Sequence, residues 1–218
     1  MIKYSDFLSR CKHSVLENKI LFMLMFFIIF IRIFFISYYH IPTSSMNPNL
    51  IEGDIVLVDK TAYNFKIPFT DIYFKLNSPN RGDVITFDHE GINMAKRVVA
   101  VSGDKIQFIK NKLYVNGEAV ILKKTSNALV DAKRFLKQQS YIYTAMNETN
   151  RDNISYDVVF ASGFTEEHLG KLIINSKVFT VPNNKYFMLG DNRNLSMDSR
   201  YIGTIHEKNN SKNTLYCI

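Results

Sequence analysis

The sequence is poor in the residues that mark several unusual classes of protein. Its 218 residues include no Trp, two Cys, five Pro and nine Gly. Two cysteines exclude a small scaffold held together by disulfides, and so few Gly and Pro exclude a collagen-like or low-complexity chain. Hydrophobic residues make up 46% of the chain, which is too many for intrinsic disorder. The length therefore predicts one or two compact domains.

The common catalytic and cofactor motifs are also missing. The sequence contains no G-x-S-x-G, no C-x-x-C, no G-x-x-x-x-G-K-[ST] and no G-x-G-x-x-G. His89-Glu90 and His206-Glu207 lack the second His that an H-E-x-x-H zinc site requires. We therefore expect no metal and no cofactor.

Positive charge is in excess but is not concentrated. The chain has 27 Lys and Arg against 20 Asp and Glu, a net charge of +7. Residues 40–218 carry a net charge of +4, scattered without a long basic run. Because a nucleic-acid binder normally concentrates its basic residues on one element, we expect no nucleic-acid partner and favour a surface that lies near anionic lipid headgroups.

One long apolar run stands near the N-terminus. Residues 20–39 contain a single charge, Arg32, and end in Tyr38-Tyr39. About 20 apolar residues in a helix match the hydrocarbon core of a bilayer, Arg32 can extend its side chain to the interface, and tyrosines are typical of that interface. The run is too long for the core of a cleaved signal peptide, and no A-x-A-like site follows it. The sequence predicts a single transmembrane helix over residues 20–39.

The flanks of this run predict its orientation. Residues 1–19 form a short basic tail with four basic residues against two acidic ones. Short basic flanks stay in the cytoplasm, so we expect the rest of the chain on the outer side of the membrane. Cys11 and Cys217 would then lie on opposite sides and could not form a disulfide.

The remainder of the chain has the alternating pattern of short strands. Strands are predicted at 54–60, 82–88, 96–101, 105–109, 112–115, 119–122 and 186–189. The pattern weakens over 123–180, where short helices at 130–139 and 165–172 and strands near 156–160 and 177–181 predict an inserted α+β subdomain. The expected organisation is mostly β, with a cytoplasmic tail (1–19), a transmembrane helix (20–39), a β core in two parts (40–122 and 181–218) and the insertion between them.

Two polar segments carry possible chemistry. The first, Pro42-Thr43-Ser44-Ser45-Met46-Asn47-Pro48, reads by itself as a hydroxyl-rich turn. The second, residues 190–200, follows a strand and holds two Arg, two Asp and two Ser, which turn chemistry alone would largely explain. Such a density of charged and hydroxyl groups also suits an ordered hydrogen-bond network.

Lys96 lies in a third segment of interest, the strand pattern around 94–98. Alternate side chains of a strand face opposite sides, so Lys96 would share an apolar face with Met94 and Val98, while Arg97 would reach solvent. Burial would lower the pKa of the amine and let it accept a proton near neutral pH. An exposed lysine on an edge strand is the simpler interpretation from periodicity alone.

Taken together and in order, these segments resemble bacterial type I signal peptidases (leader peptidases), which are membrane-anchored serine proteases with a Ser/Lys dyad. The resemblance rests on Ser-Met-x-Pro at 45–48, Gly-Asp at 53–54, Arg-Gly-Asp at 81–83, Lys-Arg at 96–97, Ser-Gly-Asp at 102–104 and the motif at 190–200. Each piece alone is weak, and the ordered set is specific. It implies that the chain removes signal peptides from exported preproteins.

The resemblance also implies roles for single residues. Ser45 would be the nucleophile, with Ser44 as the lower-ranked alternative, and Lys96 would be the general base. The Thr43 hydroxyl and the Ser45 N–H would hold the oxyanion. Ser196 would orient Lys96 by a hydrogen bond.

The family's supporting and binding positions carry over in the same way. Asp198 and Arg200 would stiffen the loop at 190–200. Small apolar pockets would accept the small side chains at positions −1 and −3 of the signal peptide; they would be lined by Ile41, Pro42, Met46, Leu50, Met94 and Ala95.

Two departures from the family pattern bear on activity. Asn194-Leu195 replaces the usual Asp-Asn, and no apolar closing strand follows Gly203-Thr204-Ile205. The sheet is therefore expected to lack a strand. A relative with a narrow substrate, such as a pilus or transfer peptidase, and a membrane-anchored homologue with impaired catalysis both remain compatible with the sequence.

Overall fold

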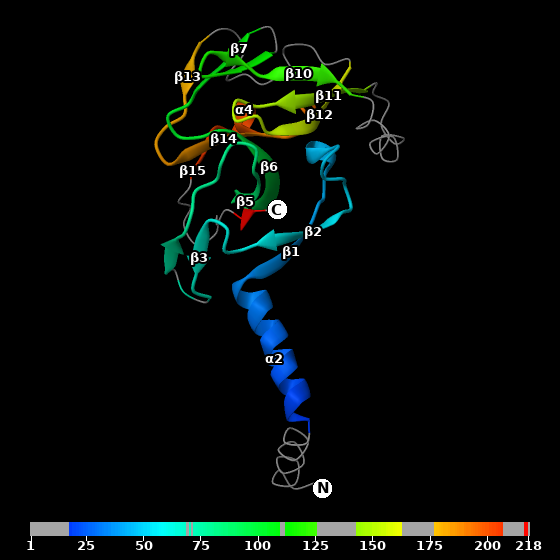
Figure 1. Cartoon of the computed structure of the whole chain (residues 1–218), viewed down its shortest axis with the longest axis vertical. Helices are drawn as coiled ribbons and strands as arrows, with labels where there is room; N and C mark the ends of the chain where they lie inside the picture. Colours follow the sequence, from blue (N-terminus) through cyan, green and yellow to red (C-terminus); the bar gives the residue numbers. More distant parts are fainter. Residues whose placement is uncertain are drawn as a thin grey trace.

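The computed structural model describes residues 18–68, 70, 72–109, 112–125, 143–162 and 177–206, together with the backbone of 216–217. It is mostly β, with one helix, α2 (Lys19–Phe34), projecting from one end of the body (Figure 1). The predicted helices at 130–139 and 165–172 lie outside the described residues.

Helix α2 ends earlier than the predicted span. Residues 36–40 form strand β1 (Ile36–His40), because they pair with β2 (Ile55–Asp59) in an antiparallel ladder. The Lys60 amine donates a hydrogen bond to the Ile33 carbonyl at the end of the helix, and the Lys60 N–H donates to Phe35. Among the described residues, no helix combines the length and the apolar content that crossing a bilayer requires.

The principal sheet has seven strands in the order β1-β2-β16-β5-β6-β14-β15. Its centre is formed by β5 (Val84–His89), β6 (Ile92–Ala100) and β14 (Lys185–Leu189), which pair antiparallel. The short strand β15 (Ile205–His206) closes one edge on β14.

The prediction that the sheet lacks a strand near the C-terminus is wrong. Strand β16 (Tyr216–Cys217) lies between β2 and β5, pairing Cys217 with Asp59 on one side and with Ile85 on the other. Sequence patterns gave no signal for it, because two residues are too short to show alternation.

Three smaller sheets complete the body. A four-stranded sheet has the order β13-β7-β8-β9, and a three-stranded sheet has the order β10-β11-β12. A two-stranded hairpin, β3-β4, lies near the end of α2 (Figure 1). The strands not yet given bounds are β3 (Asn64–Lys66), β4 (Tyr73–Lys75), β7 (Lys105–Ile109), β8 (Lys112–Val115), β9 (Glu118–Ala119), β10 (Ile121–Lys124), β11 (Tyr143–Thr149), β12 (Ser155–Ala161) and β13 (Phe179–Thr180).

The stretch from 123 to 180 contributes strands to two of these sheets. Strand β12 covers the predicted segment near 156–160, and its partner β11 was not predicted. Strand β13 matches the prediction near 177–181 but pairs with β7. Figure 1 shows the β11–β12 hairpin beside the short 3-10 turn η1 (Ser44–Met46), which places it next to the candidate site.

Strands β6 and β14 separate two hydrophobic clusters. One cluster contains Val98 and Met188, and the other contains their chain neighbours Val99 and Phe187. Alternate side chains of these strands thus face different clusters, as strand geometry requires. The middle of β6 is buried from both sides, which determines the environment of Lys96 and Arg97.

Candidate active site

Ser45 and Lys96 meet at the centre of the candidate site. The Lys96 amine lies 2.6 Å from the Ser45 hydroxyl oxygen, within hydrogen-bond distance, although the two residues are 51 positions apart. Ser45 is 9% exposed and Lys96 is 3% exposed. The Thr43 hydroxyl donates a longer hydrogen bond, 3.3 Å, to the same Ser45 oxygen.

The turn η1 presents Ser45 to the strand that carries Lys96. Thr43 has an extended backbone before the turn, and the Asn47 N–H closes the turn on the Ser44 carbonyl. Asn192 holds this turn from the other side, since its backbone N–H donates to the Ser45 carbonyl (3.0 Å) and its side-chain amide donates to the Ser44 carbonyl (3.2 Å). The Ser45 hydroxyl is thus fixed by contacts on both flanks.

Burial lowers the pKa of Lys96 from its ordinary value of 10.5 to about 8. Loss of water penalises the ammonium form most strongly. The Asp198 and Asp191 carboxylates raise the pKa again in part, and the Arg200 guanidinium lowers it. With a pKa near 8, about a tenth of the amine is neutral at pH 7. A neutral amine in contact with a hydroxyl can act as its base.

The prediction that Arg97 reaches solvent is wrong. Arg97 is 7% exposed and makes two hydrogen bonds to the Asp191 carboxylate, 2.8 and 2.6 Å, and one of 2.7 Å to the Gly82 carbonyl. Alternation places Arg97 opposite Lys96, as predicted, but the loop at 190–194 covers that face of β6. Strand periodicity gives the face of a side chain and not what lies on it.

Asp198 and Arg200 form the buried ion pair of the polar loop. The Asp198 carboxylate accepts hydrogen bonds from Arg200 Nε (2.8 Å), from Arg200 Nη2 (2.7 Å) and from the Gly190 N–H (3.0 Å). It also caps the short helix α4 (Ser199–Ile202), accepting from the Arg200 N–H. These contacts tie the two ends of the loop together.

The predicted hydrogen bond between Ser196 and Lys96 is not formed. Ser196 is buried, and its hydroxyl has no hydrogen-bond partner. It packs instead against Gly190: a Cβ at position 190 would lie 2.1 Å from the Ser196 hydroxyl oxygen and 2.5 Å from the Ser45 carbonyl oxygen. Glycine is therefore required at 190, because any side chain there would collide with Ser196 and with the Ser45 carbonyl.

Four of the residues predicted to line small apolar pockets pack together next to Ser45. Ile41, Met46 and Ala95 form a buried cluster, with Leu50 packed against it. Pro42 is exposed next to this cluster. Three residues that sequence reasoning missed pack on the same cluster: Tyr39, Val56 and Val84. Strand alternation could have indicated the two valines.

Met94 does not belong to the cluster that contains Ile41, Met46 and Ala95. It packs against the cluster that contains Phe87 and Val98, on the face of β6 opposite Ala95. Adjacent residues of a strand face opposite sides, so Met94 and Ala95, both predicted to line small apolar pockets, lie on different faces of β6.

Metal ligation has no evident place in the part of the chain that the structure describes. Within it, no three His, Cys, Asp or Glu side chains gather closely enough to hold a metal ion.

Replacing Asp198 by Asn is expected to lower the free energy of unfolding by about 3–5 kcal/mol, because Arg200 would stay buried without its counterion. Chemical denaturation followed by circular dichroism measures this loss. The matched control is Asp152→Asn, which breaks an ion pair with Arg81 at a side chain that is 42% exposed. The control should lose less than about 1 kcal/mol; equal losses in both variants would contradict the role given to burial.

Comparison with known proteins gives consistent matches. A family model described as "Signal peptidase, peptidase S26" matches residues 15–214. A signal peptidase I from Buchnera aphidicola subsp. Schizaphis graminum is 34% identical, over 89% of this chain and 74% of the relative. A signal peptidase I from Pseudomonas aeruginosa is 32% identical, over 84% of this chain and 61% of the relative. A solved signal peptidase I from Enterococcus faecalis V583 is 26% identical, with a TM-score of 0.36, over 64% of this chain and 98% of that chain.

Proposed function

We propose that Ser45 is the nucleophile and Lys96 the general base of this chain, which belongs to the family "Signal peptidase, peptidase S26". The chain is a serine peptidase that removes signal peptides from preproteins. The observation that carries the residue assignment is the 2.6 Å contact between the Lys96 amine and the Ser45 hydroxyl, both shielded from water.

The proposed reaction begins with attack of the Ser45 oxygen on the scissile carbonyl carbon. Lys96, in its neutral form, takes the hydroxyl proton as the new C–O bond forms. The negative charge that develops on the carbonyl oxygen is stabilised by the Ser45 N–H and the Thr43 hydroxyl, since such preorganised donors act at the point where charge develops. The Thr43 hydroxyl already lies 3.3 Å from the Ser45 oxygen.

Breakdown of this intermediate returns the proton. The Lys96 ammonium gives it to the leaving amine, the C–N bond breaks, and the mature protein departs while the signal peptide stays esterified to Ser45. Lys96, neutral again, then takes a proton from a water molecule that attacks the ester. The ester C–O bond then breaks, the Lys96 ammonium returns the proton to the Ser45 oxygen, and the signal peptide leaves as a carboxylic acid.

The pocket beside Ser45 is proposed to select small side chains at positions −1 and −3. Its wall would be formed by Ile41, Met46 and Ala95, which make a buried apolar cluster next to Ser45. Leu50 packs on the cluster, and exposed Pro42 lies where an extended peptide would pass.

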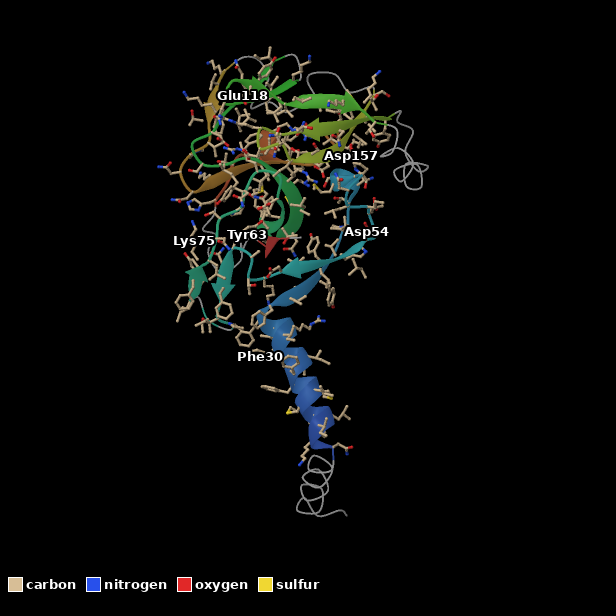
Figure 2. The ribbon with its side chains drawn as sticks, viewed as in Figure 1. Phe30, Asp54, Tyr63, Lys75, Glu118 and Asp157 are labelled. Carbon is tan, nitrogen blue, oxygen red and sulfur yellow. The ribbon has the colours of Figure 1, made fainter. Side chains whose placement is uncertain are left out.

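The apolar helix α2 (Lys19–Phe34) is proposed to anchor the chain in a bacterial inner membrane, with the N-terminal tail in the cytoplasm and the body on the outer side. None of the side chains of α2 is buried by the rest of the protein, although nearly all of them are apolar (Figure 2, Phe30). Arg32, near the end of α2, lies over the Tyr38 ring at 4.5 Å, a polar pair suited to an interface. Lipid is therefore a proposed partner, together with the preprotein.

A cleavage assay with two substrates tests the proposed specificity. Detergent-solubilised full-length protein should cut a preprotein after an A-x-A-like site. The same preprotein with Phe in place of the −1 Ala should be cut at least about 100-fold more slowly, because the pocket cannot hold the larger group. Equal rates for the two substrates would contradict the pocket assignment while leaving the dyad untouched.

A further inference from the structure

Glu148 is a buried carboxylate that the reaction described above does not use. It lies in β11, outside the motifs of the sequence, and is 1% exposed. It pairs with the guanidinium of Arg193, which is also buried, and accepts a 2.7 Å hydrogen bond from the Tyr156 hydroxyl. A carboxylate is rarely buried so fully unless it is paired and hydrogen-bonded.

The Glu148 pair continues into the polar groups behind Lys96. The Tyr156 ring stacks on the Arg97 guanidinium, with 4.1 Å from its central carbon to the ring centroid. Arg97 in turn holds Asp191 by two hydrogen bonds. Two arginines and two carboxylates therefore form one buried group of zero net charge, joined through Tyr156.

The backbone links the same hairpin to the nucleophile. The Val159 N–H in β12 donates to the Asp191 carbonyl (3.0 Å), and the Arg193 N–H donates back to the Val159 carbonyl (2.9 Å). Between these two bonds lies Asn192, whose N–H donates to the Ser45 carbonyl. Asn49 adds a side-chain link, donating to both the Asp191 carboxylate and the backbone carbonyl of Asp157, the residue labelled on the hairpin in Figure 2.

Among the described residues, Glu148 supplies the carboxylate that pairs with the buried Arg193 guanidinium. Two of its guanidinium nitrogens, Nε and Nη2, are buried without a hydrogen-bond partner. If Glu148 lost its charge, the nearest carboxylate left for Arg193 would be that of Asp191, which Arg97 already holds. Competition for one carboxylate would shift the segment 191–193 and, with it, the Ser45 carbonyl.

From these contacts we propose that Glu148 is a positioning residue of the reaction: through Arg193 it fixes the segment 191–193 and so holds Ser45 in line with Lys96. The inference rests on the proposed Ser45–Lys96 dyad. Glu148 itself touches neither the substrate nor the dyad.

The test compares Glu148→Gln with the wild type in the full-length, detergent-solubilised protein. The substitution keeps the shape and removes the charge. We expect kcat for preprotein cleavage to fall about 100-fold, because a small misplacement of reacting groups lowers a rate by about that factor. KM should stay close to the wild-type value, because the residues proposed to bind the substrate are unchanged. The acid limb of the pH–rate profile should move to lower pH, since an Asp191 carboxylate drawn toward Arg193 supports the Lys96 ammonium less.

Two further variants serve as a control and as a milder change at the same site. Glu118→Gln also removes a glutamate charge, from an exposed pair with Arg151 (3.7 Å) at the end of the body far from α2 (Figure 2), and should behave as wild type. Tyr156→Phe keeps the ring over Arg97 and the Glu148–Arg193 pair but removes one hydrogen bond to the carboxylate. It should lower kcat about 10-fold, the scale of one hydrogen bond to a charged group.

The outcomes separate the inference from the proposed function. A folded Glu148→Gln protein with the kcat and pH profile of the wild type would overturn the inference. If Glu148→Gln does not fold, a Tyr156→Phe protein with the kcat and pH profile of the wild type would overturn it instead. A parallel rise in KM with no change of pH profile would also overturn it. Cleavage that persists in Ser45→Ala would instead overturn the dyad on which the inference rests.

Discussion

Ser45→Ala is expected to lower kcat for preprotein cleavage by about 10⁶-fold, the scale at which removal of a serine nucleophile acts in other hydrolases. The alanine retains the turn and the packing of η1 but has no oxygen to attack the carbonyl. Lys96 would then have no hydroxyl proton to accept. Single-turnover cleavage of a preprotein with an A-x-A-like site, followed by gel electrophoresis, measures the loss.

Ser44→Ala is the matched control for this experiment. Ser44 is the neighbouring hydroxyl, and its contact with Asn192 uses the backbone carbonyl, which the substitution leaves in place. We expect this variant to retain most of the activity. If Ser44→Ala were inactive and Ser45→Ala active, the nucleophile would have to be reassigned to Ser44.

Lys96→Met is expected to reduce kcat by about 10⁵-fold or more, because loss of the base of such a site costs nearly as much as loss of the nucleophile. Methionine fills a similar volume among the apolar neighbours but cannot take a proton. The wild type should gain activity as the pH rises toward about 8, since its amine becomes neutral there. The residual activity of Lys96→Met should lack this acid limb, and a variant that kept it would remove Lys96 from the mechanism.

Measuring the free energy of unfolding of Lys96→Met tests whether unfolding causes its loss of activity. In the unfolded chain Lys96 keeps its ordinary pKa of 10.5, and in the folded chain the pKa is about 8. The unfolded state therefore binds the proton more readily, and wild-type stability falls as the pH drops from about 10.5 to about 8 and is then level. Near neutral pH this costs the wild type about 3 kcal/mol, so Lys96→Met should be more stable by up to that amount.

The strands of the body were predictable from sequence, and its edges were not. The central strands β5, β6 and β14 lie close to the predicted segments because their β-branched and alternating residues face two cores. The helix boundary at Phe34 was missed because Tyr38 and Tyr39 were interpreted as the interfacial end of a membrane span, and only pairing with β2 shows that residues 36–40 form a strand. Strand β16 depends on two distant neighbours in the same way.

The candidate site was predicted through the resemblance more than through local pattern. The 2.6 Å contact of Ser45 with Lys96 joins segments that no local rule connects. Alternation placed Lys96 on an apolar face, but its burial was expected only through the resemblance, and burial of Arg97 required knowledge of Asp191, which is 94 positions away. The partner of Ser196 was predicted wrongly as well, because its hydroxyl packs closely against Gly190, a contact that no local pattern shows.

Glu148 shows the limit of motif reading most clearly. It stands in a weakly patterned stretch, between segments that gave no signal of function. Its importance follows from Arg193, Tyr156 and the loop beside Ser45, all of which the fold brings to it. A charged residue that is almost completely buried is informative only once its surroundings are known.

The most direct test of the dyad is a titration of the Lys96 amine, observed by NMR of ¹⁵N-lysine-labelled full-length protein in detergent. The signal absent from Lys96→Met identifies the resonance. Burial beside Ser45 predicts a midpoint near pH 8, well below the ordinary lysine value of 10.5. A midpoint close to 10.5 would show that the amine stays charged at neutral pH and would contradict its role as the base.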